Sequence, residues 1–357
     1  MNKFLRKILD QKWSFLAVLT LLVVTAYGFY AYSLYKSFLA TPLKISGYAV
    51  EYTVKPGVSM RHIAQELTTR GLLTRSSFLV VRARMRGLAQ SIKVGEYVIH
   101  KGTLPDDLLD QFVKGKVKQY SLTLIEGKTF RDLLFSVNGH KQLRHTISAK
   151  PDQEIMKAIG QQGNPEGRFF PDTYWFPANT TDVEFLKRAY HHMDRYLNAA
   201  WDKRSAGLPL KTPYEALILA SIIEKETAQK NEYAEIAGVF IRRLKRKIRL
   251  QTDPTVIYGL GKRYTGNLKR KHLREDNPYN TYTRKGLPPT PIAMPGAEAI
   301  HAALHPAKGE TLYFVSMGNG KHHFSKTLKE HNEAVIRYQL KGDRTRTFSS
   351  RPVADKK

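Results

Sequence analysis

An uncharged stretch near the start of the chain constrains the fold most. Residues 13–35 contain no charged side chain and lie between Lys12 and Lys36. At about 1.5 Å rise per residue, a helix of this length can cross a hydrocarbon core about 30 Å thick. Aromatic residues near both ends, such as Trp13 and Tyr35, favour the headgroup layer. We therefore predict a transmembrane anchor over residues 13–35.

Basic residues before this stretch indicate its orientation. Residues 1–12 hold four Lys or Arg side chains against the single Asp10. Such an excess favours a cytoplasmic N-terminus, with the chain after residue 35 on the outer side. The alternative is a cleavable signal peptide, whose apolar region would span about 7–15 residues before a small-residue cleavage site. Here the apolar stretch is longer and no Ala-x-Ala follows it, which favours a retained anchor.

Composition removes several classes of site and partner. The chain has no cysteine, which excludes disulfides, thiol nucleophiles and cysteine metal ligands. With 58 Lys and Arg against 31 Asp and Glu, the formal net charge is +27. Such a field attracts anionic partners. The predicted topology argues against nucleic acid and favours phospholipid or a carboxylate-bearing cell wall. The basic block 242–249 fits either a solvated helix face or a role in this attraction.

A small unit over residues 48–118 is expected after a linker, 36–47. Its predicted elements are a strand over 51–57, a helix after Ser59, a helix over 76–86, a strand over 93–99 and a helix from 104 to 115. In the second helix Phe78, Val81 and Met85 form one apolar stripe, with Leu79 beside it.

The strongest local signal lies at residues 212–227 in the larger region, 119–340. Thr212 and Glu215 form a capping-box pattern with Pro213 at the first helical position. Residues 216–223 are apolar on nearly every side, which is typical of a helix inside a core. This helix then delivers two carboxylates, Glu224 and Glu226. Poor solvation would raise a carboxyl pKa toward that of a general acid. Periodicity does not choose between the two, and both could instead be solvated.

Three further segments carry polar side chains in rigid contexts. Residues 250–259 mix polar and strand-forming residues, and Asp253-Pro254 is expected to break a helix. Residues 277–292, rich in Pro, Tyr and Asn, predict a rigid loop with hydrogen-bonding tips suited to a sugar. Each could equally be an ordinary connection. Residues 312–316 predict a strand that turns back toward His322-His323. No third ligand lies at a helical spacing from this pair, so we predict no metal site.

Together these segments resemble the YceG-like endolytic murein transglycosylases. The matching stretches are 171–174, 220–227, 250–259, 279–292, 305–307 and 330–332. Residues 52–57 with Ile63-Ala64 resemble the opening of a LysM module, a small sugar-polymer-binding unit. The chain departs from the family at Arg242 and Met294, where asparagine is usual or frequent.

The resemblance implies Glu226 as the catalytic acid and Glu224 as a supporting carboxylate. It also implies substrate-binding or supporting roles for Gln251, Asp253, Thr255, Tyr258, Asn280, Tyr282, Glu166, Asp172 and Tyr174. No cofactor is implied. The expected fold class is α+β: an anchor at 13–35, a LysM-like domain at 48–118, a mixed catalytic domain at 119–340 and a disordered basic tail at 341–357.

The implied reaction is a non-hydrolytic cleavage of the β-1,4 bond between N-acetylmuramic acid and N-acetylglucosamine, a lyase activity. The implied location is the bacterial inner membrane, with the bulk of the chain in the periplasm. Peptidoglycan strands and penicillin-binding proteins are the implied partners. Two alternatives stay open: a hydrolytic muramidase with Asp253 activating water, and a non-enzymatic peptidoglycan-binding anchor.

Overall fold

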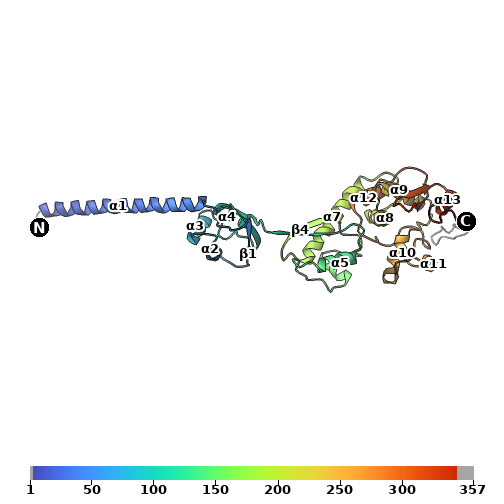
Figure 1. Ribbon diagram of the computed structural model, residues 1–357, viewed down its shortest axis with the longest axis horizontal. Helices are drawn as coiled ribbons and strands as arrows, with labels where there is room; N and C mark the ends of the chain where they lie inside the picture. The colour runs from blue at the N-terminus through green and yellow to red at the C-terminus, as the bar shows by residue number, and fades with distance from the viewer. Residues whose placement is uncertain (1–2, 344–357) are drawn as a thin grey trace. The chain divides into compact units, whose positions relative to one another are not determined.

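The computed structural model describes residues 3–343 as an α+β protein, which confirms the predicted fold class (Figure 1). The chain divides into two compact units, Met1–Tyr120 and Ser121–Lys357. The strands described form three two-stranded sheets, β1–β2, β3–β4 and β5–β6. Most of the predicted disordered tail, residues 344–357, lies outside the described residues.

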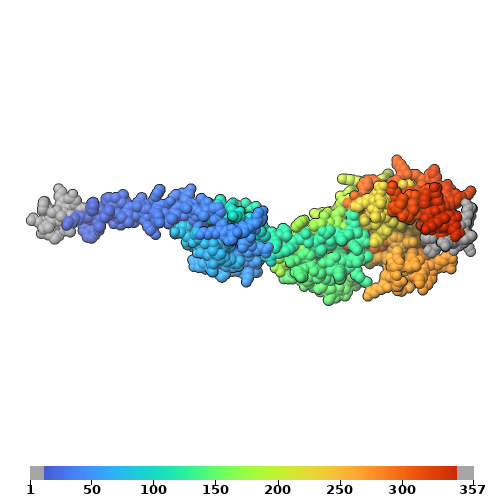
Figure 2. Space-filling view, viewed as in Figure 1, coloured from blue at the N-terminus to red at the C-terminus, as the bar shows by residue number. Residues whose placement is uncertain are grey.

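A long N-terminal helix dominates the first unit. Helix α1 runs from Lys3 to Ala40, and its segment Lys12–Ala40 contains an 18-residue window with a mean hydropathy of 1.9 and no buried residue. Figure 2 shows the middle of this helix, drawn in blue, extending away from the small core that follows it. By length and composition the helix can cross a membrane, and it contains the predicted span 13–35.

The end of α1 packs onto a small α+β core. The elements that follow are β1 (Ala49–Val54), α2 (Met60–Thr69), α3 (Ser76–Met85), β2 (Gly95–His100) and α4 (Pro105–Lys114). Strands β1 and β2 pair antiparallel, with Tyr52 opposite Tyr97. Phe38 of α1 joins the same buried cluster as Phe112. As predicted, Ser59 caps α2, and α4 ends at a glycine, Gly115, whose φ of 65° suits the left-handed region.

The apolar stripe predicted for α3 is not the face that the helix buries most. The helix buries Leu79, Val80 and Ala83, while Val81 is 44% and Met85 71% exposed. The consecutive apolar residues 78–81 fit more than one helical phase, and packing against α2 and α4 selects the face that carries the small Ala83.

The second unit is mostly helical. Its elements are β3 (Gln119–Thr123, which begins at the end of the first unit), α5 (Phe130–Asn138), α6 (Asp152–Ala158), β4 (Thr173–Pro177), α7 (Asp182–Asp202), α8 (Pro213–Glu226), α9 (Tyr233–Lys245), α10 (Asp253–Leu260), α11 (Arg270–Arg274), α12 (Ala297–Leu304), β5 (Tyr313–Ser316), β6 (His322–Ser325) and α13 (Leu328–Tyr338). Short 3-10 turns occupy Lys230–Glu232 and Gly261–Arg263.

Helix α8 is the centre of this unit. All residues from Ala216 to Ile223 are buried, and the helix packs against α7, α9, α10 and α12 (Figure 1). The Thr212 side chain accepts a hydrogen bond from the Glu215 backbone N–H, as predicted for an N-cap. The Glu215 carboxylate reaches back to the N–H of Lys211 at 2.6 Å, one residue before the cap.

Two local predictions near the C-terminal half had different outcomes. The expectation that Asp253-Pro254 breaks a helix is wrong, because α10 begins at Asp253. Proline is tolerated in the first turn of a helix, where its missing N–H has no intrahelical partner to lose. The predicted return of the strand at 312–316 is confirmed: β5 and β6 form an antiparallel hairpin with Val315 opposite His323.

Candidate active site

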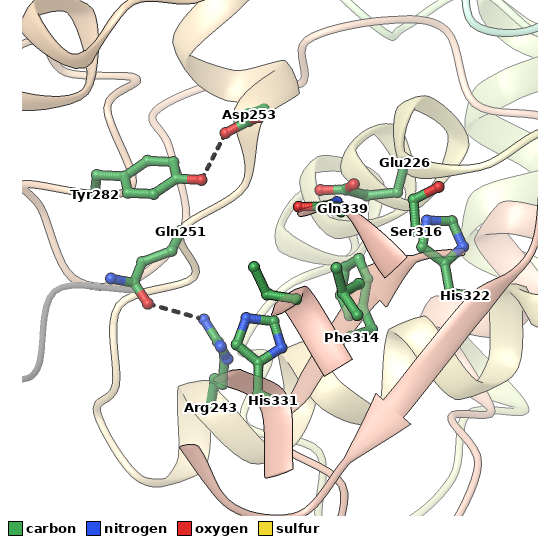
Figure 3. Close-up of a pocket in the computed structure, with 12 residues that line it drawn as sticks. Glu226, Arg243, Gln251, Asp253, Tyr282, Phe314, Ser316, His322, His331 and Gln339 are labelled. Carbon is green, nitrogen blue, oxygen red and sulfur yellow. Dashed lines mark hydrogen bonds between the residues drawn. The ribbon is translucent and has the colours of Figure 1, made fainter. Parts of the chain in front are cut away.

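The end of α8 delivers Glu226 to a cavity of about 200 Å³ (Figure 3). Three regions form its walls: the end of α8, the segment from α9 to α10 with Tyr282, and the β5–β6 hairpin with α13. The lining residues are Glu226, Arg243, Gln251, Asp253, Tyr282, Phe314, Val315, Ser316, His322, His331, Val335 and Gln339. The cavity therefore combines a carboxyl at the end of a buried helix with polar groups from distant parts of the chain.

Glu226 sits in surroundings that favour its protonated form. Burial raises the pKa of its carboxyl to about 7, with a further increase from the charge of Asp253. Thr252, which is 2% exposed, donates a hydrogen bond to Glu226 Oε1 and acts in the opposite direction, as does the charge of Arg243. A carboxyl with this pKa can hold a proton near neutral pH and also release it, as general acid–base catalysis requires.

The raised pKa also predicts how stability depends on pH. Glu226 keeps its proton in the folded state up to about pH 7, whereas an ordinary glutamate in the unfolded chain loses it near 4.5. Rising pH therefore lowers the free energy of unfolding of the wild type, by about 3 kcal/mol once the pH exceeds both pKa values. We expect the stability of Glu226→Gln relative to wild type to increase between pH 5 and pH 8, measured by chemical denaturation. A difference that does not change with pH would contradict the raised pKa.

A second carboxyl, Asp253, lies in the same cavity. Tyr282 Oη donates a hydrogen bond of 2.5 Å to Asp253 Oδ1 (Figure 3). Burial raises the pKa of Asp253, and the hydrogen bond from Tyr282 partly offsets this. The cavity thus holds two carboxyls with different hydrogen-bond donors: Thr252 donates to Glu226, and Tyr282 donates to Asp253.

Arg243, on α9, joins two walls of the cavity. Its guanidinium donates to the carbonyls of Leu312 at 2.7 Å and Leu250 at 2.8 Å, and to Gln251 Oε1 at 3.3 Å (Figure 3). The side chain is buried and lies 5.0 Å from the ring centre of Tyr313. Gln251 has a φ of 55°, which few residues other than glycine adopt, so this anchor holds an unusual backbone conformation. The sequence alone placed Arg243 in a basic block and missed this role.

The basic residues of the block 242–249 have two different environments in the structure. Arg242 donates to the carbonyl oxygens of Thr311 at 2.6 Å and Ala307 at 2.9 Å, so this departure from the family pattern makes structural contacts. Lys245, Arg246 and Lys247 are exposed. Part of the block therefore binds backbone carbonyls, and part faces solvent.

Two histidines line the hairpin side of the cavity. His322 Nδ1 lies 2.7 Å from Glu232 Oε2, and its backbone N–H donates to the other carboxylate oxygen at 2.9 Å. Its neighbour His323 is exposed, because successive strand residues point to opposite faces. His331 on α13 stacks on Tyr313 at 5.3 Å, and burial lowers its pKa to about 4, which keeps the ring neutral. Within residues 3–343, His331 Nδ1 has no hydrogen-bond partner.

Glu224 lies outside this cavity. Its carboxylate accepts from the backbone N–H of Gly296 at 3.0 Å and from Tyr233 Oη at 3.2 Å, linking α8 to α12 and α9. Burial raises the pKa of Glu224. Residues two apart on a helix point about 200° away from each other, so only Glu226 reaches the cavity.

Two other predicted site residues, Thr255 and Asn280, do not line the cavity but hold the segments that carry its lining residues. Thr255 bonds the carbonyl of Thr252 at 2.8 Å and the hydroxyl of Thr281 at 2.9 Å. The Asn280 side-chain amide donates to the carbonyls of His272, Leu273 and Glu275, which fixes the loop that carries Tyr282. Both side chains are buried and engaged in holding backbone rather than open to a ligand.

The remaining predicted residues lie elsewhere in the second unit. Tyr258 Oη donates to Glu166 Oε2 at 3.0 Å, and burial raises the pKa of Glu166 to about 7. Tyr174 donates to the carbonyl of Phe170 at 2.7 Å, while Asp172 is exposed. Of the predicted set, the structure brings together Glu226, Gln251, Asp253 and Tyr282.

Comparisons with known proteins agree in pointing to one family. The model of the YceG-like family matches residues 52–337. A protein of Bacillus subtilis (strain 168) named endolytic murein transglycosylase is 31% identical over 326 residues, which cover 85% of this chain and 88% of that protein. A protein of the same name from Streptococcus pneumoniae is 26% identical over 360 residues, which cover 91% of this chain and 64% of that protein.

A solved structure shows the same likeness in three dimensions. The crystal structure of a YceG-like protein from Listeria monocytogenes matches with a TM-score of 0.52 and 28% sequence identity. The match covers 80% of this chain and 98% of that one.

Proposed function

The chain belongs to the YceG-like family, and from this premise we propose that it is a lytic transglycosylase in which Glu226 cleaves glycan strands of peptidoglycan. The shared name of its relatives, endolytic murein transglycosylase, supports an enzyme acting on peptidoglycan. The observation that carries the assignment of Glu226 is its carboxyl, held in a cavity with a pKa of about 7.

In the first step, Glu226 donates its proton to the oxygen that links N-acetylmuramic acid to N-acetylglucosamine. The C1–O bond breaks as positive charge develops at C1 and the ring oxygen. Glu226 becomes a carboxylate, which the hydrogen bond from Thr252 and the charge of Arg243 stabilise. When the bond breaks, Glu226 gains a negative charge, and Thr252 and Arg243 are the groups of the cavity that stabilise it.

In the second step, the Glu226 carboxylate takes the proton of the C6 hydroxyl of the muramic acid. The hydroxyl oxygen attacks C1 and leaves a 1,6-anhydro end, and Glu226 regains its proton. Because the substrate supplies the nucleophile, one carboxyl suffices, whereas glycoside hydrolases typically use two.

Hydrolysis is a second candidate, and the presence of Asp253 in the same cavity favours it. In that reaction Asp253 would activate a water molecule that attacks C1. The hydrogen bond from Tyr282 favours the carboxylate form that such a base requires.

The ends of the products distinguish these reactions. We expect murein digested with the wild-type protein to yield 1,6-anhydro ends by mass spectrometry, and Asp253→Asn to give the same ends at a lower rate. Asp253 transfers no proton in the transglycosylase reaction. Its replacement therefore changes the rate only through the charge and shape of the cavity around Glu226. Reducing ends from the wild type, together with their loss in Asp253→Asn, would identify a hydrolase.

The location and partners belong to the same proposal. Helix α1 serves as a single-pass anchor in a bacterial inner membrane, with the chain after residue 35 in the periplasm. Residues 48–118, which contain β1, α2, α3, β2 and α4, act as the LysM-like glycan-binding module, and penicillin-binding proteins are the expected neighbours. The apolar span and the basic residues before it support this orientation. A periplasmic reporter fused to the C-terminus should be active, and an inactive reporter would reject the topology.

A further inference from the structure

Helix α3 exposes an apolar stripe beside the end of α1, on a different face from the one that carries Leu79 and Ala83. Met85 is 71% and Val81 44% exposed, and Phe78 is half-buried on the same side. The face with Leu79 and Ala83 is fully buried. Val81 and Met85 extend the half-buried Phe78 into an exposed apolar patch, and such a patch leaves water only against a partner.

The stripe adjoins the end of the predicted membrane span. The Phe78 ring lies edge-on to Tyr35 and also contacts Phe38, with ring centres 5.7 Å apart in both pairs. The Tyr35 hydroxyl lies 3.8 Å from Met85 Sδ. Tyr35 is the last residue of the span, and Lys36 follows it. Because a tyrosine before a lysine is expected at the headgroup layer, α3 lies at that depth as well.

Arginines flank the stripe on both sides. Arg75 and Arg84 are exposed, and the Arg75 guanidinium lies 5.5 Å from the ring centre of Phe78. Arg82 and Arg86 are instead bound to the carboxylates of Asp106 and Asp110 within the unit. Two cations beside an apolar row are typical of helices that lie in the plane of a membrane surface and contact anionic lipids.

We propose that α3 lies against the headgroup layer of the outer leaflet, with Phe78, Val81 and Met85 between the lipids and Arg75 and Arg84 on lipid phosphates. The inference rests on the anchoring of α1 in a membrane, part of the proposed function. A second contact beside the span would hold the small core of residues 48–118 against the bilayer surface.

Site-specific labelling of the full-length chain tests this contact, and the chain offers a clean background because it has no cysteine. Single cysteines replace Met85 in α3, Tyr27 in α1 and Gln65 on the exposed face of α2, each carrying an environment-sensitive fluorophore. The proteins are reconstituted in vesicles of phosphatidylethanolamine and phosphatidylglycerol that contain a headgroup-level or a chain-level lipid quencher.

We expect the label at Met85→Cys to be quenched by headgroup-level quencher about threefold more than the label at Gln65→Cys, as for a helix buried 5–10 Å into the interface. The label at Tyr27→Cys should respond to the chain-level quencher. In phosphatidylcholine vesicles, and in the Arg75→Gln, Arg84→Gln background, quenching at Met85→Cys should fall. The matched pair Lys55→Gln and Arg61→Gln, also exposed, should leave it unchanged.

Equal quenching at Met85→Cys and Gln65→Cys, with strong quenching at Tyr27→Cys, would overturn the contact while leaving the anchor intact. A blue-shifted label at Met85→Cys that lipid quenchers do not reach would assign the stripe to a second protein copy and also overturn it. An unquenched label at Tyr27→Cys would reject the anchor itself, and the contact with it.

Discussion

The Glu226→Gln variant should release soluble fragments from murein about 10²–10⁴-fold more slowly than the wild type, the range that a general acid and base typically contributes. Glutamine keeps the shape of the side chain and can still accept the hydrogen bond from Thr252. It has no proton to give to the leaving oxygen and cannot later take one from the C6 hydroxyl. Binding to sacculi should persist, because the substitution removes a reacting group and leaves the cavity walls in place.

Glu224→Gln is the matched control for this experiment. Glu224 sits on the same helix, is also partly buried and also has a raised pKa, but its carboxylate bonds Gly296 and Tyr233 away from the cavity. We expect its replacement to lower stability and to reduce activity far less than Glu226→Gln does. Comparable activity loss in both variants at equal stability, or an active Glu226→Gln protein, would remove Glu226 from the chemistry.

The second large effect is expected at Arg243. Arg243→Met keeps much of the side-chain volume and removes a buried donor set that serves the carbonyls of Leu250 and Leu312. A buried acceptor left unsatisfied costs about 1–3 kcal/mol, so we expect a loss of about 3 kcal/mol in the free energy of unfolding, measured by chemical denaturation. Murein cleavage should fall as well, since the segment with Gln251 and the β5–β6 hairpin would no longer be tied together.

Two further substitutions are controls for the loss of stability expected in Arg243→Met. Lys245→Met removes a cation from the same helix, but at an exposed position, and should change stability little. Arg243→Lys keeps the charge without the planar fork that reaches several carbonyls, and should lie between wild type and Arg243→Met. A fully stable Arg243→Met protein would show that the guanidinium does not hold these walls together.

Local signals in the sequence account for most of the elements that position the site. The Thr212 cap, Pro213 and the apolar residues 216–223 define α8 with its end at Glu226, because capping and burial both act within a few turns of one helix. The β5–β6 hairpin follows in the same way from an apolar strand and a glycine-rich turn. The choice between Glu224 and Glu226 needs the neighbours of α8, and periodicity alone leaves it open.

The parts that could not be predicted depend on contacts between distant segments. Arg243 lies in a run of cations, and only its contacts with the carbonyls of Leu312 and of residues 249–250 reveal it as buried. His331 lines the cavity because α13 packs on the hairpin, and its sequence context gives no sign of this. In α3 the contiguous apolar residues allow two phases, and contacts with α2 and α4 choose between them.

The proton on Glu226 is tested most directly by the pH dependence of kcat/KM for release of 1,6-anhydro fragments, since this parameter reports the free enzyme. We predict that activity falls on the alkaline side with a pKa of about 7. In Thr252→Val this limb should move to higher pH, because a hydrogen bond that favours the carboxylate is lost. A limb centred near the ordinary glutamate value of 4.5, or a limb unmoved in Thr252→Val, would contradict the role assigned to Glu226.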